Sequence, residues 1–373
     1  MDILINFIQD LGHLLLIYII PLVIVLGIMI FFHELGHFLA AKLFNIKVLK
    51  FALGFGPKIV AREVGETEYS IRYIPLGGFV KMLGEDETDE ESAPIDEKDI
   101  KRAFNHQNPF KRIAVVAAGP IFNLILAFFL FFGLYLVSGD YIRTPEIGEV
   151  VAGSPAQKAG LMKGDIIVGI NGESINKFAD LKAVIEKSAG IPVKITVKRG
   201  DNLLSLTLVP EEVTAKDEFG EEVKTARIGV AEAGKIKQVK LGPVDAFTKS
   251  ISETWRWIKL TGLVVVKLFE GVVSIKTVGG PIMIGQMTGQ LVQEGIGYLI
   301  PFMAIISINL GILNLFPIPI LDGGVIFFLL LELVMGRPVS VDKREIAQKI
   351  GLSILLLLMV VVFYNDILRL FTK

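Results

Sequence analysis

The sequence contains no cysteine among its 373 residues. Disulfide bonds are therefore excluded, as are a thiolate nucleophile and a metal site built from cysteine sulfur. Histidine is scarce, so any histidine chemistry must come from His13, His33, His37 or His106. These absences leave carboxylates and a few imidazoles as the groups most suited to catalysis or metal binding.

Charged residues are also few, and their signs balance. They make up 21% of the chain, and 38 basic against 39 acidic side chains give a formal net charge of −1. We expect no nucleic-acid partner, because such proteins carry an excess of positive charge that neutralises phosphates. A mean hydropathy of +0.59 indicates a membrane protein, since a water-facing surface cannot be built from this composition.

The hydrophobic residues are gathered into long runs. About 20 apolar residues span a bilayer, and residues 14–32 and 113–137 are uncharged runs of that length. A third run, 298–331, is interrupted by polar residues and prolines, and a fourth, 350–363, can be extended to residue 370. These runs predict a polytopic α-helical membrane protein with about four transmembrane helices in the lipid bilayer. The first run is too long for a cleavable signal peptide and lacks a basic segment before it.

The positions of lysine and arginine predict the orientation. Near the ends of the predicted spans, basic residues occur in 42–112 and 337–349, whereas the chain before Lys42 has none. Because cytoplasmic loops carry the excess of basic residues, we expect these two segments in the cytoplasm and residues 138–250 outside. Both termini then lie outside, in a multi-pass protein of the cell's inner (cytoplasmic) membrane.

A group of metal-binding residues lies at the end of the first run. His33, Glu34 and His37 form the motif HELGH. Residues four apart share one face of a helix, so the two histidines can bind one ion. Glu34, one position along, can accept a proton from water at that ion. Ionisable side chains at membrane depth are costly, which favours a functional interpretation.

Two histidines do not complete a catalytic zinc site, which needs a third protein ligand. His106 lies in a polar loop and fits an ordinary surface residue. Asp322 is the only carboxylate between Glu294 and Glu332, in a mostly apolar stretch. A helix cap or turn before two glycines would be an ordinary role for it in a soluble protein. At membrane depth an unpaired carboxylate is expensive, so we favour Asp322 as the third ligand.

The motifs together resemble the site-2 protease family of intramembrane zinc proteases, of the bacterial regulator-of-sigma-E protease type. The most specific match is SINLGILNLFPIPILDGG at 307–324, combined with HELGH. FALGFGP at 51–57 is similar to the family's membrane-dipping β-hairpin, and RYIPLGGFVKMLGE at 72–85 to the segment after it. AAGPIFNLILA at 117–127 resembles the motif of its second span.

The resemblance implies a catalytic centre with one Zn²⁺ per chain. It implies that His33, His37 and Asp322 bind the zinc and that Glu34 is the general base. Pro317 and Pro319 break the third span and free backbone carbonyls, an arrangement suited to holding an extended peptide. The resemblance also implies a set of substrate-binding residues, namely Asn314, Pro317, Pro319, Gly54, Phe55 and Gly56.

The polar middle of the chain has a different character. Alternating apolar and polar residues between 145 and 212 predict strands, and SPAQKAGLMKGDIIVGINGESI at 154–175 resembles the PDZ fingerprint. PDZ domains bind extended peptides by adding a strand to a sheet edge. A β-module without a ligand remains open, and only one such segment is present where some family members carry two.

These interpretations divide the chain into seven segments. They are the first transmembrane helix with HELGH (1–41), a cytoplasmic loop with the membrane-dipping β-hairpin (42–112), the second transmembrane helix (113–137), an inserted extracytoplasmic PDZ-like α+β domain (138–232), a linker and interfacial amphipathic helix (233–297, the helix expected at 251–278), the third transmembrane segment with LDGG (298–336), and a cytoplasmic loop with the fourth transmembrane helix (337–373).

The sequence therefore predicts an intramembrane zinc endopeptidase with its active site towards the cytoplasmic side. It would cleave transmembrane segments of client proteins, such as an anti-sigma factor or a remnant signal peptide, with zinc-activated water. The alternative is a non-catalytic membrane scaffold that binds peptides through its PDZ-like domain. A transporter with broken helices is disfavoured, because the sequence shows no inverted repeats.

Overall fold

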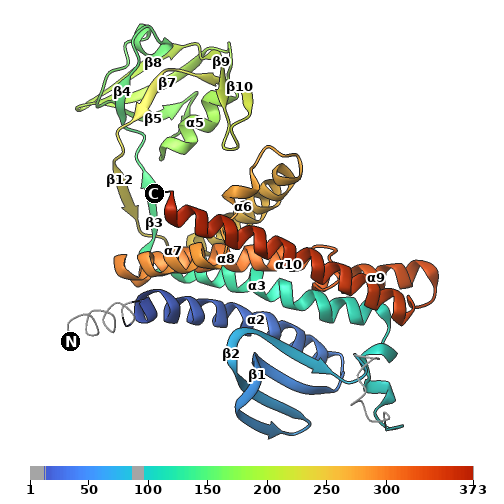
Figure 1. The fold of residues 1–373 in the computed structure, drawn as a ribbon. Coiled ribbons are helices and arrows are strands. Elements are labelled where there is room, and N and C mark those ends of the chain that lie inside the picture. The colour runs from blue at the N-terminus through green and yellow to red at the C-terminus, as the bar shows by residue number, and fades with distance from the viewer. Residues whose placement is uncertain (1–11, 13, 86–95, 373) are drawn as a thin grey trace. The chain divides into compact units, whose positions relative to one another are not determined.

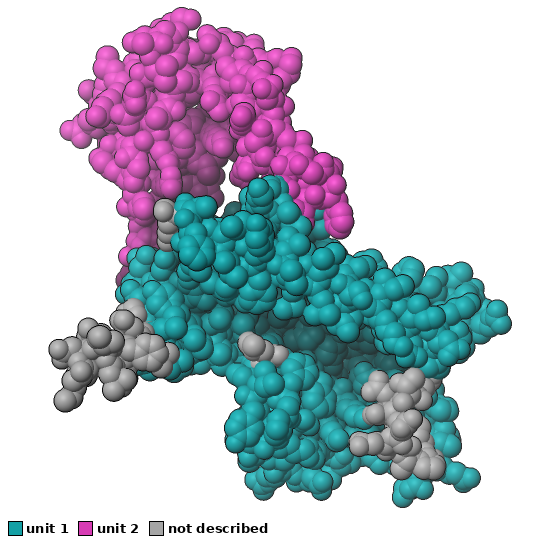
Figure 2. All heavy atoms as spheres, viewed as in Figure 1, with its two compact units in different colours: residues 1–134, 247–266, 274–373 teal, residues 135–246, 267–273 magenta. Residues whose placement is uncertain are grey.

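The computed structural model describes residue 12, residues 14–85 and residues 96–372, so His13 lies outside the described residues. The chain forms two compact units, which Figures 1 and 2 show. Unit 1 consists of residues 1–134, 247–266 and 274–373, and unit 2 of residues 135–246 and 267–273. Each unit is thus built from segments that are separated in the sequence.

Four helices in the described part of the chain are long and apolar enough to cross a membrane, which confirms the predicted number. The first combines η1 (Leu14–Ile19) with α2 (Ile20–Leu43), and the second is α3 (Pro109–Ser138). The third is α8 (Ile296–Asn314) and the fourth is α10 (Val341–Phe371). The segment expected as a loop at 337–349 is helical from Val341, because its charged residues form the polar first turns of α10.

A break separates α8 from the next helix, α9 (Asp322–Met335). Proline has no backbone N–H and disfavours a helical conformation of the preceding residue, so Pro317 and Pro319 stop the helix as predicted. The chain then folds back tightly on the first turn of α9. A Cβ at Gly323 would meet the carbonyl of Leu315, and one at Gly324 would meet that of Ile318.

Two further helices lie wholly or mostly in unit 1. The expected helix at 251–278 is observed as α6 (Pro243–Phe269), which starts earlier because Pro243 suits the first turn of a helix. Its Phe247 packs edge-on against Phe128 of α3, with ring centroids 5.3 Å apart. After the short turn η4 (Ile275–Thr277) comes α7 (Pro281–Glu294), which packs against α2, α8 and α10.

A buried carboxylate joins α10 to α7. Asp366 is 2% exposed, and its two oxygens accept hydrogen bonds from the backbone N–H groups of Gly280, Ile282 and Met283, at 3.0, 3.0 and 3.1 Å. The first N–H groups of a helix have no partner within the helix. Asp366 therefore caps α7 with a side chain from a distant helix.

A β-hairpin follows α2. It consists of β1 (Val48–Val64) and β2 (Thr67–Met82), which pair antiparallel. Both strands bend, so that residues 50–53 of β1 lie beside residues 78–81 and also beside residues 68–71 of β2. Phe51 and Val80 pack with Ala41 of α2 and Val115 of α3 in one apolar cluster, which fixes the hairpin beside the two helices.

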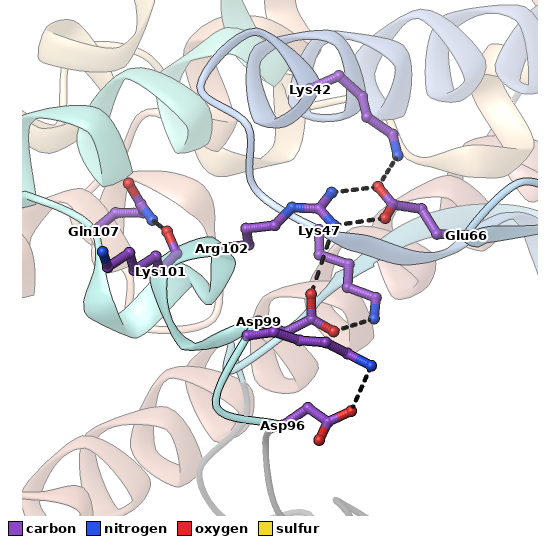
Figure 3. Close-up of polar contacts among 9 residues, drawn as sticks. Lys42, Lys47, Glu66, Asp96, Asp99, Lys101, Arg102 and Gln107 are labelled. Carbon is purple, nitrogen blue, oxygen red and sulfur yellow. Dashed lines mark hydrogen bonds and ion pairs between the residues drawn. The ribbon is translucent and has the colours of Figure 1, made fainter.

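Ion pairs hold the turn of this hairpin (Figure 3). Glu66 accepts hydrogen bonds from Arg102, at 2.6 and 2.8 Å, and from Lys42 at the end of α2, at 2.9 Å. These two cations lower the pKa of Glu66 to about 2. Lys47 donates to Asp99 at 2.5 Å in the same cluster. The ionised Glu66 thus ties the hairpin to α2 and to the turn η2 (Ile100–Arg102), which is followed by the turn η3 (Phe104–His106).

Unit 2 is rich in β-structure. Its largest sheet has four strands in the order β6–β5–β7–β8, and three two-stranded sheets are formed by β3–β12, β4–β11 and β9–β10. Its apolar core includes Ile147, Ile167, Leu181 and Ile195. The elements are β3 (Asp140–Arg143), β4 (Ile147–Val150), α4 (Pro155–Lys158), β5 (Ile166–Ile170), β6 (Glu173–Ser174), α5 (Phe178–Glu186), β7 (Val193–Arg199), β8 (Asn202–Leu208), β9 (Glu211–Lys216), β10 (Glu222–Arg227), β11 (Val230–Glu232) and β12 (Ile236–Val239).

Candidate metal centre and active site

Three side chains from two distant parts of the sequence converge inside unit 1. His33 and His37 lie four residues apart on α2, and each is 9% exposed. Nε2 of His33 lies 3.3 Å from Nε2 of His37 and 3.2 Å from Oδ2 of Asp322. Nε2 of His37 lies 3.6 Å from Oδ1 of Asp322. The break between α8 and α9 thus places the carboxylate of Asp322 beside the two imidazoles.

The geometry and chemistry of this cluster fit a zinc ion. Ligand atoms bound tetrahedrally at about 2.0–2.1 Å from zinc are about 3.3 Å apart, which is close to the distances from Nε2 of His33 to Nε2 of His37 and to Oδ2 of Asp322. Two imidazole nitrogens and one carboxylate oxygen form a common catalytic zinc set. Oδ2 of Asp322 is shielded from solvent and accepts no hydrogen bond from the described residues. A cation bound here would neutralise the negative charge of that oxygen.

The alternative role of Asp322 as a helix cap does not match the structure. Asp322 is the first residue of α9, whose N-cap position is Leu321, and its Oδ2 accepts no hydrogen bond from the described residues, whereas the oxygens of Asp366 are occupied by the N–H groups of α7. His106 and the nearby carboxylate Glu332 have partners of their own. His106 contacts the amide of its neighbour Asn105 at 2.7 Å, and Glu332 forms an ion pair with Arg112.

The first turns of α3 orient the His37 ring. Nδ1 of His37 lies 3.0 Å from the carbonyl oxygen of Val115. A carbonyl only accepts hydrogen bonds, so Nδ1 carries the hydrogen and Nε2 presents a lone pair to the cluster. Two glycines allow this approach, because a Cβ at Gly36 would meet the carbonyl of Ala118 and one at Gly119 would meet the His37 ring.

Glu34 lies beside the hairpin. It is 8% exposed, and a Cβ at Gly78 of β2 would come within 2.8 Å of its Cγ. Glycine at position 78 therefore lets the strand pass directly over Glu34. Sequence reasoning missed this glycine, as it missed Gly36, Gly119 and Val115, because their roles depend on contacts between segments that lie far apart in the chain.

The predicted substrate-binding residues take different positions. Nδ2 of Asn314 lies 3.5 Å from Nε2 of His33, so this amide borders the cluster directly. Pro317 and Pro319 lie in the break that leads to Asp322. Gly54 lines a mostly apolar cavity of about 360 Å³ between α2 and the hairpin. Phe55 is 45% exposed and stacks on Phe79 at 6.5 Å, and Gly56 accepts a hydrogen bond from Arg72 through its carbonyl.

Comparison with known proteins gives matches along most of the chain. A family model described as Peptidase family M50 matches residues 21–358. A protein of Brucella suis named "Putative zinc metalloprotease" is 37% identical over 94% of each chain. Proteins with the same descriptive name are 38% identical in Campylobacter jejuni, over 93% of this chain and 92% of that one, and 37% identical in Clostridium acetobutylicum, over 94% and 97%.

Similar solved structures cover a smaller part of the chain. The PDZ domain of an SdrC-like protein from Listeria monocytogenes is 25% identical with a TM-score of 0.20, and covers 24% of this chain and 87% of that one. The corresponding domain from Listeria innocua is 30% identical with a TM-score of 0.19, over 24% and 92%.

Proposed function

The chain belongs to peptidase family M50 and is a zinc metalloprotease, and from this premise we propose that it hydrolyses peptide bonds within membrane-spanning segments of client proteins. The observation that carries this proposal is the location of the His33–His37–Asp322 cluster. His33 lies ten residues before the end of the apolar span at Leu43, which is about 15 Å along a helix. A cluster at that depth is suited to a substrate that is itself in the membrane.

We assign the chemical roles as follows. His33, His37 and Asp322 hold the zinc, which when bound polarises a carbonyl and lowers the pKa of water. The carboxylate of Glu34 accepts a proton from the attacking water and donates it to the leaving amine. The amide of Asn314, next to His33, donates a hydrogen bond to the oxygen of the scissile carbonyl and stabilises the charge that develops there.

The client must be unwound before it can react, because every backbone group of a spanning helix is already paired. Residues 78–82 of β2 pair with β1 along one side, and Gly78 brings this strand against Glu34. We propose that the unwound client lies extended along β2 as an added strand. The backbone of the α8–α9 break, at Pro317 and Pro319, borders the other side of the client.

Cleavage of a defined client tests this function. The protein and a client with one apolar span are reconstituted together in lipid vesicles, and the fragments are mapped by mass spectrometry. We expect a cut inside the apolar span, lost with a chelator and regained with added Zn²⁺. Cuts confined to the client's polar flanks would contradict an intramembrane protease, and a client that stays intact would favour the scaffold alternative.

Unit 2 contributes a binding groove rather than chemistry. A groove of about 970 Å³ lies between α5, the β9–β10 hairpin and the segment 151–155, and it contains apolar side chains such as Phe178, Leu181 and Val213. We propose that this PDZ-like unit collects extended peptides of clients. A non-catalytic scaffold would need only this groove. The scaffold hypothesis therefore does not explain why His33, His37 and Asp322 converge.

We further propose that the protein lies in the inner membrane with unit 2 outside the cytoplasm, following the distribution of basic residues. Single cysteines test this orientation on a background free of cysteine. Lys158 and Lys98 have side chains 67% and 78% exposed. In intact cells, Lys158→Cys is expected to react with an impermeant thiol reagent, and Lys98→Cys only after lysis. The reverse pattern would invert the topology.

A further inference from the structure

Asn123 of α3 is a buried amide that adjoins the metal centre. The residue is 0% exposed. Its Nδ2 lies 3.3 Å from Nδ1 of His33, and its Oδ1 is buried without a hydrogen-bond partner among the described residues. Its backbone carbonyl accepts a hydrogen bond from the hydroxyl of Ser307 at 2.8 Å. Asn123 therefore contacts α2 through its side-chain amide and α8 through its backbone carbonyl, and its amide oxygen is unused.

The two histidines of the cluster are supported from the same helix. Val115 of α3 accepts from Nδ1 of His37, and Asn123 faces Nδ1 of His33. A histidine that binds a metal through Nε2 carries its hydrogen on Nδ1, and that hydrogen needs an acceptor. A half-turn of the Asn123 amide brings Oδ1 to the position of Nδ2. The turn breaks no hydrogen bond of Oδ1, because this oxygen has none.

We propose that Asn123 is a positioning residue of the metal centre: its amide oxygen accepts a hydrogen bond from Nδ1 of His33 and so holds Nε2 towards the metal. This inference rests on the proposed zinc site. It completes a symmetric arrangement in which α3 supplies one acceptor to each imidazole. Removal of such an outer partner typically weakens metal binding 10–100-fold.

Zinc affinity of the purified full chain in detergent tests the proposal, with a chromophoric chelator as competitor. Asn123→Leu keeps a similar volume but has no acceptor, and we expect zinc to bind 10–100-fold more weakly. Asn123→Asp restores an acceptor, and we expect affinity within a few-fold of wild type. Asn365→Leu is the matched control, because Asn365 is also buried but bonds to Ile275, away from the cluster. It should bind zinc as wild type does.

The outcomes separate positioning from packing. Thermal unfolding of the chelator-treated proteins measures any general loss of stability, and Asn123→Ala replaces the leucine variant if that protein does not fold. Equal zinc affinity of Asn123→Leu and wild type would overturn the proposal. So would an Asn123→Asp protein as weak as Asn123→Leu, since that result assigns the loss to packing. A wild-type chain that binds no zinc would instead refute the zinc site itself.

Discussion

Asp322→Asn is expected to lose most of its bound zinc together with its proteolytic activity, whereas Glu34→Gln is expected to keep its zinc and lose only the activity. The asparagine retains the shape of the side chain but replaces an anionic ligand with a weak neutral oxygen, and two imidazoles alone hold zinc poorly. Glu34→Gln leaves all three ligands in place and removes the proton acceptor. General-base catalysis typically contributes 10²–10⁴-fold to the rate, and we expect a loss of that size.

Metal content and client cleavage, measured on the same purified proteins, separate these roles. Asp366→Asn is the matched control for Asp322→Asn, because it also neutralises a buried carboxylate on a helix of unit 1. Asp366 caps α7, so its loss should lower the thermal stability and leave the zinc content unchanged. Full zinc and full activity in Asp322→Asn would remove Asp322 from the centre.

The sequence allowed us to predict that His33, His37 and Asp322 could form one candidate metal centre, and the structure brings these three residues together. Residues four apart lie on the same face of a helix, so the sequence alone places His33 beside His37. Asp322 stands out in the sequence because it is the single carboxylate in an apolar run that prolines interrupt. The number of apolar helices followed from run length in the same way. The ends of the helices were less accurate. Val341 begins α10 before the apolar run, because polar residues extend a helix as readily as apolar ones.

The supporting residues were not predictable, since their partners are distant in sequence. Asn123 and His33 are 90 positions apart, and Val115 and His37 are 78 apart. Neither an asparagine nor a backbone carbonyl in an apolar helix has a pattern that identifies an imidazole as its partner. Asp366 shows the converse. It is a carboxylate in an apolar helix, as Asp322 is, and only the contacts distinguish a cap from a candidate ligand.

The second large effect is expected from replacing a glycine of α3 with alanine. Gly119 and Gly133 lie on the same helix and differ in the atoms that surround them. A Cβ at Gly119 would fall on the His37 ring, whereas a Cβ at Gly133 meets nothing within 4 Å. Alanine stabilises a helix interior by about 1 kcal/mol relative to glycine. Gly133→Ala is therefore expected to be neutral or slightly more stable, with normal zinc affinity and activity.

Gly119→Ala gains the same helix propensity as Gly133→Ala. Any loss of stability or zinc affinity must therefore come from the contact of the new methyl group with the His37 ring. The methyl group has to displace either α3 or the His37 ring, whose Nδ1 is fixed on Val115. A displaced ring no longer directs Nε2 at Asp322, and we expect zinc affinity to fall at least about tenfold, as for the loss of an outer partner. Thermal unfolding and zinc titration of both variants decide the point. If Gly119→Ala binds zinc as tightly as Gly133→Ala, the α2–α3 contact does not set the position of His37, and the distance between Nε2 of His37 and Asp322 must be maintained by the ion alone.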